Sequence, residues 1–160
     1  VAQPLGLIVR HVAELAGTGA GHAEVTDLAH DLVGRSLLVF APDTLEYLQK
    51  GGRIGRASAL LGTVLSIKPI LTVEDGVVTS LDKKRTSAKA RARMLEMAGE
   101  RPVEQVAVVH ILSPDVEAFR DQVAAATGRA PEEVEIGMTG PVAGTHLGPG
   151  MIGISRIFPA

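Results

Sequence analysis

The chain has 160 residues with a formal net charge of −2, and 46% of the residues are apolar. This length and composition exclude a disordered chain and allow one domain, or one domain with part of a second, around a buried core. The absence of cysteine excludes a disulfide framework and a thiolate site, and it is compatible with a reducing cytoplasm, where we expect the protein to be located. The weakly negative charge gives no general reason to bind nucleic acid or an anionic membrane.

The N-terminal part of the chain is predicted to form two helices and a strand. Apolar residues at helical spacing predict a first helix that starts almost at residue 1 and closes at Gly17. The same pattern predicts a second helix over residues 22–33, with Gly34 as its stop. The apolar run over residues 36–41 predicts a short buried strand.

Further helices and strands are predicted along the rest of the chain. Asp43 stands three residues before Glu46, which is capping-box spacing and predicts a short helix that ends at Gly51 and Gly52. The Asp-Gly pair at residues 75–76 predicts a tight hairpin. The other predicted elements are, in chain order, a helix over 56–65, strands over 67–73 and 77–81, a helix from Thr86 or Ser87 to about residue 98, a strand over 103–112, a helix that starts at Ser113-Pro114, and strands over 132–138 and 150–158.

The order of these elements defines the predicted fold class. The hairpin implies antiparallel pairing, whereas the later strand–helix–strand order allows some parallel pairing. We therefore predict a mixed α/β fold with a largely antiparallel sheet packed with helices.

Residues 136–155 carry no formal charge over the length of a membrane span. The segment holds six glycines, two prolines and only eight apolar side chains, which is too few for contact with lipid. We therefore predict a loop-rich segment and not an integral membrane protein.

The first candidate site is the sequence Gly51-Gly52-Arg53-Ile54 at the end of the predicted short helix. The two glycines permit a left-handed turn and a close approach of the backbone to another group. An arginine fixed behind them can hold a carboxylate or a phosphate with its two-pronged guanidinium. The alternative is an ordinary helix end with a solvated arginine, and the motif is neither a Walker A loop nor a dinucleotide fingerprint.

The second candidate site is the sequence Gly144-Thr145-His146-Leu147-Gly148-Pro149-Gly150, which is predicted to be a loop. A glycine-rich backbone offers free N–H groups to an anion, and a histidine held there can donate a hydrogen bond. The alternative is a histidine with a surface or structural role. Four other histidines are predicted to be structural or solvated, namely His11, His22, His30 and His110.

The third feature is a run of cations with no acidic residue before Glu96. Its members are Lys83, Lys84, Arg85, Lys89, Arg91 and Arg93. Such a run can form a positive face that docks an acidic partner or a phosphate, or it can be a solvated helix face. Nothing in the sequence has the spacing of a metal site or of a nucleophilic catalytic motif. The residues alone indicate an anion-binding or carboxylate-binding surface and no specific reaction.

Several sequence blocks, taken in order, resemble the DegV family. They are residues 44–54 (TLEYLQKGGRI), 67–71 (IKPIL), 75–76 (DG), 84–86 (KRT) with 89–90 (KA), and 144–150 (GTHLGPG). The resemblance implies a two-lobed bacterial protein that binds a long-chain fatty acid in a tunnel between its lobes. It also implies that the protein is the fatty-acid-binding partner of a fatty acid kinase and presents the carboxylate without performing the chemistry. It implies no cofactor and no catalytic residue. We expect no nucleic acid partner, because the run of cations has no interleaved aromatic residues and stands in a chain with a net negative charge.

The same resemblance assigns roles to single residues. Those expected near the acid end of the ligand are Gly52, Arg53, Ile54, Thr145 and His146. Those expected on the face that meets the kinase are Lys84, Arg85 and Lys89.

The family's N-terminal lobe has an early loop with Asp-Ser or Thr and a Ser-Gly-rich loop, and neither block is present here. We therefore expect residues 1–35 to be a helical segment that connects from a missing N-terminal lobe, and residues 36–160 to be the C-terminal α/β domain. Two other functions stay open. One is a phosphoryl-transfer enzyme that uses His146, with Arg53 as a phosphate clamp, and the other is a regulatory or nucleic-acid-binding module that uses the run of cations.

Overall fold

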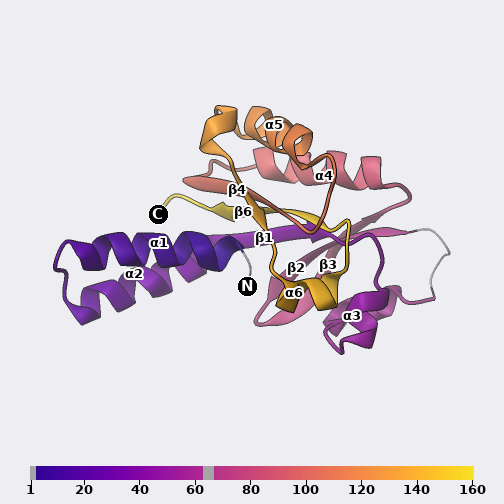
Figure 1. Cartoon of the computed structure of the whole chain (residues 1–160), viewed down its shortest axis with the longest axis horizontal. Helices are drawn as coiled ribbons and strands as arrows, with labels where there is room; N and C mark the ends of the chain where they lie inside the picture. Colours follow the sequence, from indigo (N-terminus) through magenta and orange to yellow (C-terminus); the bar gives the residue numbers. More distant parts are fainter. Residues whose placement is uncertain (1–2, 63–66) are drawn as a thin grey trace.

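A computed structural model of the chain describes residues 3–62 and 67–160 (Figure 1). Helices are labelled α, 3-10 helices η and strands β. In chain order, the elements are α1 (Gln3–Gly17), α2 (His22–Arg35), β1 (Ser36–Ala41), α3 (Glu46–Lys50), η1 (Gly55–Leu60), β2 (Lys68–Glu74), β3 (Val77–Lys84), α4 (Ser87–Gly99), β4 (Gln105–His110), α5 (Val116–Thr127), η2 (Pro131–Glu133), β5 (Glu135–Met138), α6 (Pro141–Leu147) and β6 (Ile152–Ile157).

Within the described residues, six strands form one sheet in the order β3-β2-β1-β6-β4-β5. The pair β4–β5 is parallel, and the other four neighbouring pairs are antiparallel. The predicted mixed α/β fold with a largely antiparallel sheet is therefore confirmed.

The hairpin between β2 and β3 shows how local sequence determines one part of this sheet. Asp75 has φ 49° and Gly76 has φ 77°, so both central residues of the turn are left-handed. This backbone matches the twist of the two flanking strands, which is why an Asp-Gly pair favours a tight hairpin. The predicted turn is confirmed. β3 continues to Lys84, however, beyond the predicted end at residue 81.

Helices cover both faces of the sheet (Figure 1). α4 and α5 lie on one face, where their apolar side chains pack against Val39 and Ile154. α3 and α6 lie on the other face, where Leu48 and the partly buried Leu147 pack with Phe40. Because successive side chains of a strand point to opposite faces, Val39 and Phe40 belong to different core clusters.

The α1–α2 pair packs at the side of the sheet and extends beyond it (Figure 1). Leu7 and Leu32 are buried there, together with Ala107 of β4 and Ile157 of β6. α2 continues to Arg35, past the stop predicted at Gly34, and β1 begins at the next residue. The proposed division of the chain after residue 35 stays a prediction.

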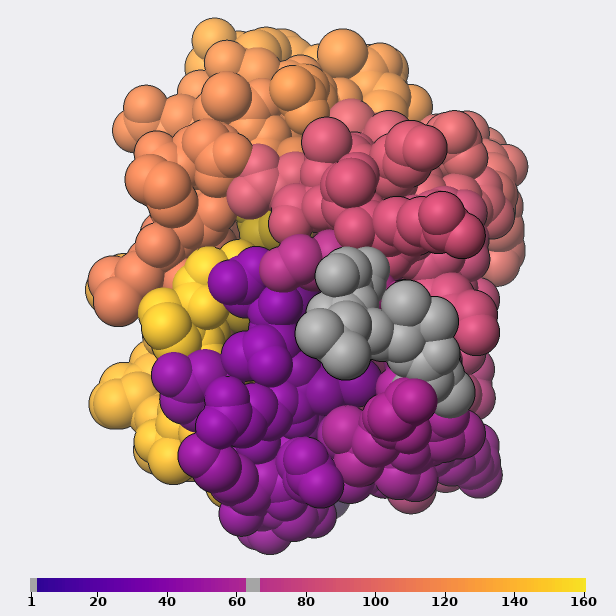
Figure 2. Space-filling view, turned by 90° about the vertical axis from the view of Figure 1, so that its right-hand side faces the viewer, coloured from indigo at the N-terminus to yellow at the C-terminus, as the bar shows by residue number. Residues whose placement is uncertain are grey.

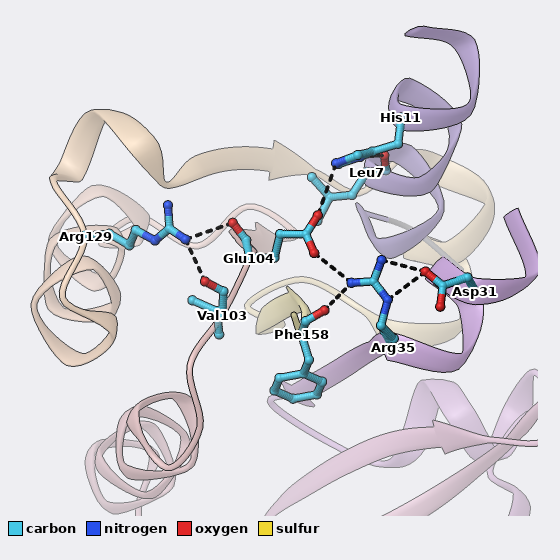
Figure 3. Close-up of polar contacts among 8 residues, drawn as sticks. All are labelled: Leu7, His11, Asp31, Arg35, Val103, Glu104, Arg129 and Phe158. Carbon is cyan, nitrogen blue, oxygen red and sulfur yellow. Dashed lines mark hydrogen bonds and ion pairs between the residues drawn. The ribbon is translucent and has the colours of Figure 1, made fainter. Parts of the chain in front are cut away.

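A polar network joins this helical pair to the ends of two strands (Figure 3). The guanidinium of Arg35 donates hydrogen bonds to the carboxylates of Asp31 and Glu104, at 2.8 and 2.7 Å, and to the backbone carbonyl of Phe158. Arg129 donates to the backbone carbonyls of Val103 and Glu104, at 2.6 and 2.9 Å. Residues that are distant in the sequence are therefore tied together where β4 begins and β6 ends.

Two predictions about the segment after β1 are wrong in detail. The predicted capping role of Asp43 is not formed, because Asp43 pairs with Lys68 and the hydroxyl of Thr44 accepts from the backbone N–H of Glu46 at 3.2 Å. The helix predicted over residues 56–65 is a short 3-10 helix, η1, which ends at Leu60. Residues 63–66 of that prediction lie outside the described residues.

Candidate functional site

An apolar pocket of about 170 Å³ lies on the sheet face that carries α3 and α6. Its walls come from β1, β2, β3 and β4, from α3 and α6, and from the residue that precedes β6. They include the apolar side chains of Leu38, Phe40, Leu48, Val109, Leu147 and Met151. Arg53 and His146 are the polar side chains among the described residues of the lining. The fold thus brings together the two residues that the sequence analysis selected from separate motifs.

Arg53 is positioned by the end of α3. Its backbone N–H donates to the carbonyl of Leu48 at 2.9 Å, and Gly52 has φ 66°, as expected for a left-handed turn after a helix. The guanidinium donates to the carbonyl of Gly51 at 3.2 Å and is otherwise exposed at the pocket. It can therefore pair with an anionic group at the pocket without a large movement of the backbone.

His146 lies in the last turn of α6, and not in a loop as the sequence predicted. The helix starts with Pro141, whose fixed φ suits the first helical position, and it ends at Gly148, whose φ is 76°. The hydroxyl of Thr145 donates to the carbonyl of Pro141 at 2.9 Å, within the same helix. Thr145 does not line the pocket.

Two of the other expected ligand-binding residues also lie outside the pocket lining. Gly52 forms the turn that precedes Arg53, and Ile54 packs against the apolar cluster beneath α3. The ligand-binding roles of Gly52, Ile54 and Thr145 stay predictions.

α3 and α6 pack closely where a glycine at the end of each helix meets a side chain of the other. A Cβ atom on Gly51 would lie 2.1 Å from Nδ1 of His146, and one on Gly148 would lie 2.3 Å from Cδ2 of Tyr47. The buried Nδ1 of His146 has no hydrogen-bond partner among the described residues. The positioning roles of Tyr47 and Gly148 were not predicted from the sequence, although both residues lie in the blocks that carried the resemblance.

The run of cations is less positive than its sequence indicates. Lys84 pairs with Asp82 at 2.9 Å, and Arg93 lies 3.4 Å from the same carboxylate. Arg91 pairs with Asp115 at the start of α5. Acidic residues outside the run therefore neutralise part of its positive charge.

Three members of the run stay exposed on this part of the surface. Lys83, Arg85 and Lys89 form no ion pair with another described residue. Arg85 lies between the end of β3 and the start of α4, and Lys89 lies in the first turn of α4. The partner-binding role of Lys84, Arg85 and Lys89 stays a prediction.

A second hollow, the charged cleft, has a volume of about 240 Å³ and lies on the opposite sheet face. β1 and β4 both run antiparallel to β6, so these two strands end at the same edge of the sheet. The charged cleft opens at that edge (Figure 2). Ion pairs line it, with Lys68 donating to Asp43 and Arg91 donating to Asp115. The buried hydroxyl of Ser113 also donates to Asp115, at 2.9 Å. Nothing in the sequence pattern predicted this cleft.

The pKa of Asp115 is lowered from its ordinary 3.8 to about 2. The largest cause is hydrogen bonding from Arg91, and the second largest is the hydrogen bond from Ser113. A carboxylate with a depressed pKa stabilises the folded state above its unfolded pKa, and this contribution is lost as the pH falls through the folded value. We expect Asp115→Asn to reduce the free energy of unfolding at neutral pH, with a difference from wild type that shrinks between pH 4 and pH 2. Urea unfolding at a series of pH values measures this difference.

Asp121→Asn, on the exposed side of α5, is the matched control and should show little effect on stability at any of these pH values. A stability difference for Asp115→Asn that stays constant down to pH 2 would contradict the assigned pKa.

The uncharged residues 136–155 fold as parts of β5, α6 and β6. Among the described residues, no helix is both long enough and apolar enough to cross a membrane.

These features define an α/β domain with an apolar pocket that carries one arginine and one histidine. A family model described as "Uncharacterised protein, DegV family" matches residues 1–158. The chain belongs to the DegV family.

Relatives and solved structures agree with this assignment. A DegV domain-containing protein from Streptomyces coelicolor is 37% identical over 163 residues, which cover 96% of this chain and 56% of that protein. A DegV family protein from Thermus thermophilus, whose structure is described as showing fatty acid binding, has a TM-score of 0.87 and 31% identity, covering 98% of this chain and 57% of that one. A fatty-acid-binding DegV family protein from Streptococcus agalactiae has a TM-score of 0.85 and 26% identity, covering 98% of this chain and 56% of that one. The chain thus spans little more than half the length of these proteins.

Proposed function

We propose that this chain binds a long-chain fatty acid in the apolar pocket and presents the carboxylate to a fatty acid kinase partner. The observation that carries the proposal is an apolar pocket in which Arg53 and His146 are the polar side chains. The similar structures from Thermus thermophilus and Streptococcus agalactiae, both described as fatty-acid-binding, support it. In this proposal the chain is a cytoplasmic lipid-binding subunit and not a catalyst.

The chemistry of the pocket fits an acyl chain with an acidic end. Each methylene that leaves water for an apolar wall contributes about 0.8 kcal/mol to binding. The carboxylate would accept hydrogen bonds from the guanidinium of Arg53, which is exposed beside the apolar walls. His146 has Nδ1 against the backbone of Gly51, which leaves its other ring nitrogen as the donor for the same carboxylate.

The direct test is to identify what the protein carries. Protein purified from a bacterial host is denatured, extracted with organic solvent and analysed by mass spectrometry, and lipid-free protein is then offered a mixture of fatty acids. We expect a stoichiometric fatty acid after either route. An unrelated protein from the same host, taken through the same extraction, shows the background. Protein that carries no fatty acid and takes none up would contradict the proposal.

For the partner, we propose that the exposed cations around Arg85 form the contact with the kinase. Arg85→Ala should leave the fatty-acid content unchanged and weaken association with the kinase several-fold at low salt, since surface charges steer encounters between proteins. Binding is measured by surface plasmon resonance at two salt concentrations, and fatty-acid content by mass spectrometry.

The matched control for Arg85 is Arg120→Ala, which removes a cation that pairs with Asp121 on α5. Equal weakening by both substitutions would show a general effect of charge. An Arg85→Ala protein without lipid would contradict the separation of the two roles.

The other two functions have less support. The described lining of the pocket contains no carboxylate to hold the magnesium ion that a phosphoryl transfer to His146 would use. Part of the run of cations is neutralised by Asp82 and Asp115, which weakens the case for nucleic acid binding. An acid-labile mass increase after incubation with a phosphate donor, or salt-sensitive binding to duplex DNA, would favour these functions instead.

A further inference from the structure

Two serines in the described part of the chain have an exposed hydroxyl that is not used in the fold. Ser58 lies in η1 and Ser87 is the first residue of α4, and both are exposed without a hydrogen bond from the hydroxyl to another described residue. Thr86 is exposed as well, but its hydroxyl accepts from the backbone N–H of Lys89 at 3.3 Å and caps α4. Ser58 and Ser87 are therefore the hydroxyls whose modification would break no hydrogen bond of the fold.

Of these two serines, Ser87 alone directly follows a cluster of cations. The cluster consists of Lys83, Lys84 and Arg85, which stand four, three and two positions before the serine. Ser58 has one cation, Arg56, within the same distance, and Arg56 is itself paired with a carboxylate. Charge pattern is one basis on which protein kinases select their substrates. The sequence before Ser87 therefore suits a protein kinase that selects basic segments.

The charged residues of α4 are arranged against its dipole. The N-terminal end of a helix carries partial positive charge and the C-terminal end carries partial negative charge. α4 has no acidic residue in its first turn, where Lys89 lies. Glu96 and Glu100 lie instead towards its C-terminal end. A negative charge on Ser87 would be stabilised by the dipole and by the N–H groups of the first turn, which have no partner inside the helix.

Arg91 lies one turn after Ser87 on α4. The two residues line the charged cleft together, and both also line a hollow of about 470 Å³ between α4 and α5. Side chains four residues apart on a helix are neighbours. A guanidinium has five N–H donors, so Arg91 can hold a phosphoryl group on Ser87 while it shares its remaining donors with Asp115.

We propose that Ser87 is a phosphorylation site for a protein kinase that selects basic segments, and that Arg91 and the first turn of α4 hold the product. In this reaction the hydroxyl oxygen attacks the γ-phosphorus of ATP, and the bond from that phosphorus to the oxygen of the departing ADP breaks. The hydroxyl proton passes to the base of the protein kinase. The phosphoserine carries about 1.5 to 2 negative charges at neutral pH.

This charge would stand among the exposed cations that are proposed above to contact the fatty acid kinase. Arg85 lies two residues before Ser87 and Lys89 lies two residues after it. Phosphorylation therefore reverses the charge at the centre of that surface and weakens the encounter with the fatty acid kinase. This consequence rests on the proposed function, whereas the phosphorylation site itself does not.

The first test locates the phosphoryl group. The protein is incubated with magnesium ATP and the catalytic subunit of cyclic-AMP-dependent protein kinase, which selects serines that follow cations, and is analysed by intact and fragment mass spectrometry. We expect one phosphoryl group per chain, on Ser87, and none on Ser87→Ala. Ser58→Ala is the matched control and should be phosphorylated like wild type. No incorporation, or incorporation at Ser58 or Thr86 in place of Ser87, overturns the proposal.

The second test asks whether Arg91 and the helix end hold the phosphoryl group. Phosphorylation should raise the midpoint of thermal unfolding by about 2–4 °C in wild type, and by clearly less in Arg91→Met. Arg93→Met removes a cation of the same helix that pairs with Glu96 and Glu100, and it should keep the wild-type gain. An equal gain in wild type and Arg91→Met overturns the role of Arg91. No gain in wild type overturns the role of the helix end as well.

The third test measures association with the fatty acid kinase by surface plasmon resonance. The phosphorylated protein should bind several-fold more weakly than the unphosphorylated protein at low salt, with a smaller difference at high salt and an unchanged fatty-acid content. Equal binding of the two forms overturns the effect of Ser87 on this contact. Failure of the unphosphorylated protein to bind contradicts the proposed function instead, and a phosphoryl group mapped to Ser87 would still support the site.

Discussion

Arg53→Ala is expected to lower the affinity for dodecanoate by about ten- to a hundredfold, with little change in the free energy of unfolding. The reason is that a charge-assisted hydrogen bond to a carboxylate in an apolar site is worth about 1.5–3 kcal/mol, whereas an exposed guanidinium contributes little to folding. Displacement of a fluorescent fatty acid measures the affinity. Dodecanol, which has the same chain without the charge, should bind to the variant and to wild type equally.

Arg56→Ala is the matched control for this experiment. Arg56 lies three residues further along the chain, is 61% exposed and pairs with Glu74 instead of lining the pocket. Equal losses for Arg53→Ala and Arg56→Ala, or equal losses for the acid and the alcohol, would show that Arg53 does not hold the carboxylate. His146→Ala should reproduce the selective loss of acid over alcohol, and His146→Gln, which retains an N–H donor, should restore part of it.

Gly148→Ala is expected to destabilise the folded state by about 2–6 kcal/mol. Gly148 has φ 76° and ψ 167°, a backbone conformation that essentially only glycine adopts and that costs other residues about 1–3 kcal/mol. The added Cβ would also lie 2.3 Å from the ring of Tyr47, and such overpacking costs about 1–3 kcal/mol more. Guanidinium unfolding measures the loss of stability.

Gly150→Ala separates the two contributions, because Gly150 has φ 82° while its new Cβ would have ordinary contacts, from 3.4 Å, with Asp43. Gly148→Ala should therefore cost more than Gly150→Ala, and adding Tyr47→Ala should recover the difference. Equal costs for the two glycine substitutions would contradict the close packing of Tyr47 on Gly148.

Some elements of the fold can be predicted from the sequence because the residues within the element determine its structure. The hairpin turn at Asp75 needs only its own two residues, and the hydroxyl of Thr86 caps α4 as predicted by accepting from the N–H of Lys89 at 3.3 Å. α6 is different. A seven-residue helix with Gly144 inside it has too little intrinsic stability to be predicted, and the contact of its end with α3 holds it in place.

From the residue patterns alone, the candidate site could be predicted only as separate parts, and only the resemblance to the DegV family placed Arg53 and His146 near the same end of a ligand. The sequence identified Arg53 and His146 from glycine-rich surroundings, but nothing in their spacing shows that they line one pocket. The charged cleft was not predictable, because Lys68 reaches Asp43 across 25 positions and Arg91 reaches Asp115 across 24. Such pairs depend on how the strands are ordered in the sheet, and sequence periodicity carries no information about strand order.

The start of β6 places the two hollows of this domain one peptide bond apart. Gly150 lines the charged cleft and Met151 lines the apolar pocket, on opposite faces of the sheet. Both residues form backbone hydrogen bonds with Ile111, the residue after β4. The N–H of Gly150 donates to the carbonyl of Ile111 at 2.7 Å, and the N–H of Ile111 donates to the carbonyl of Met151 at 2.9 Å. A backbone shift here that widens the apolar pocket would therefore also reshape the charged cleft behind it, so that a substitution at the start of β6 is expected to affect both surfaces.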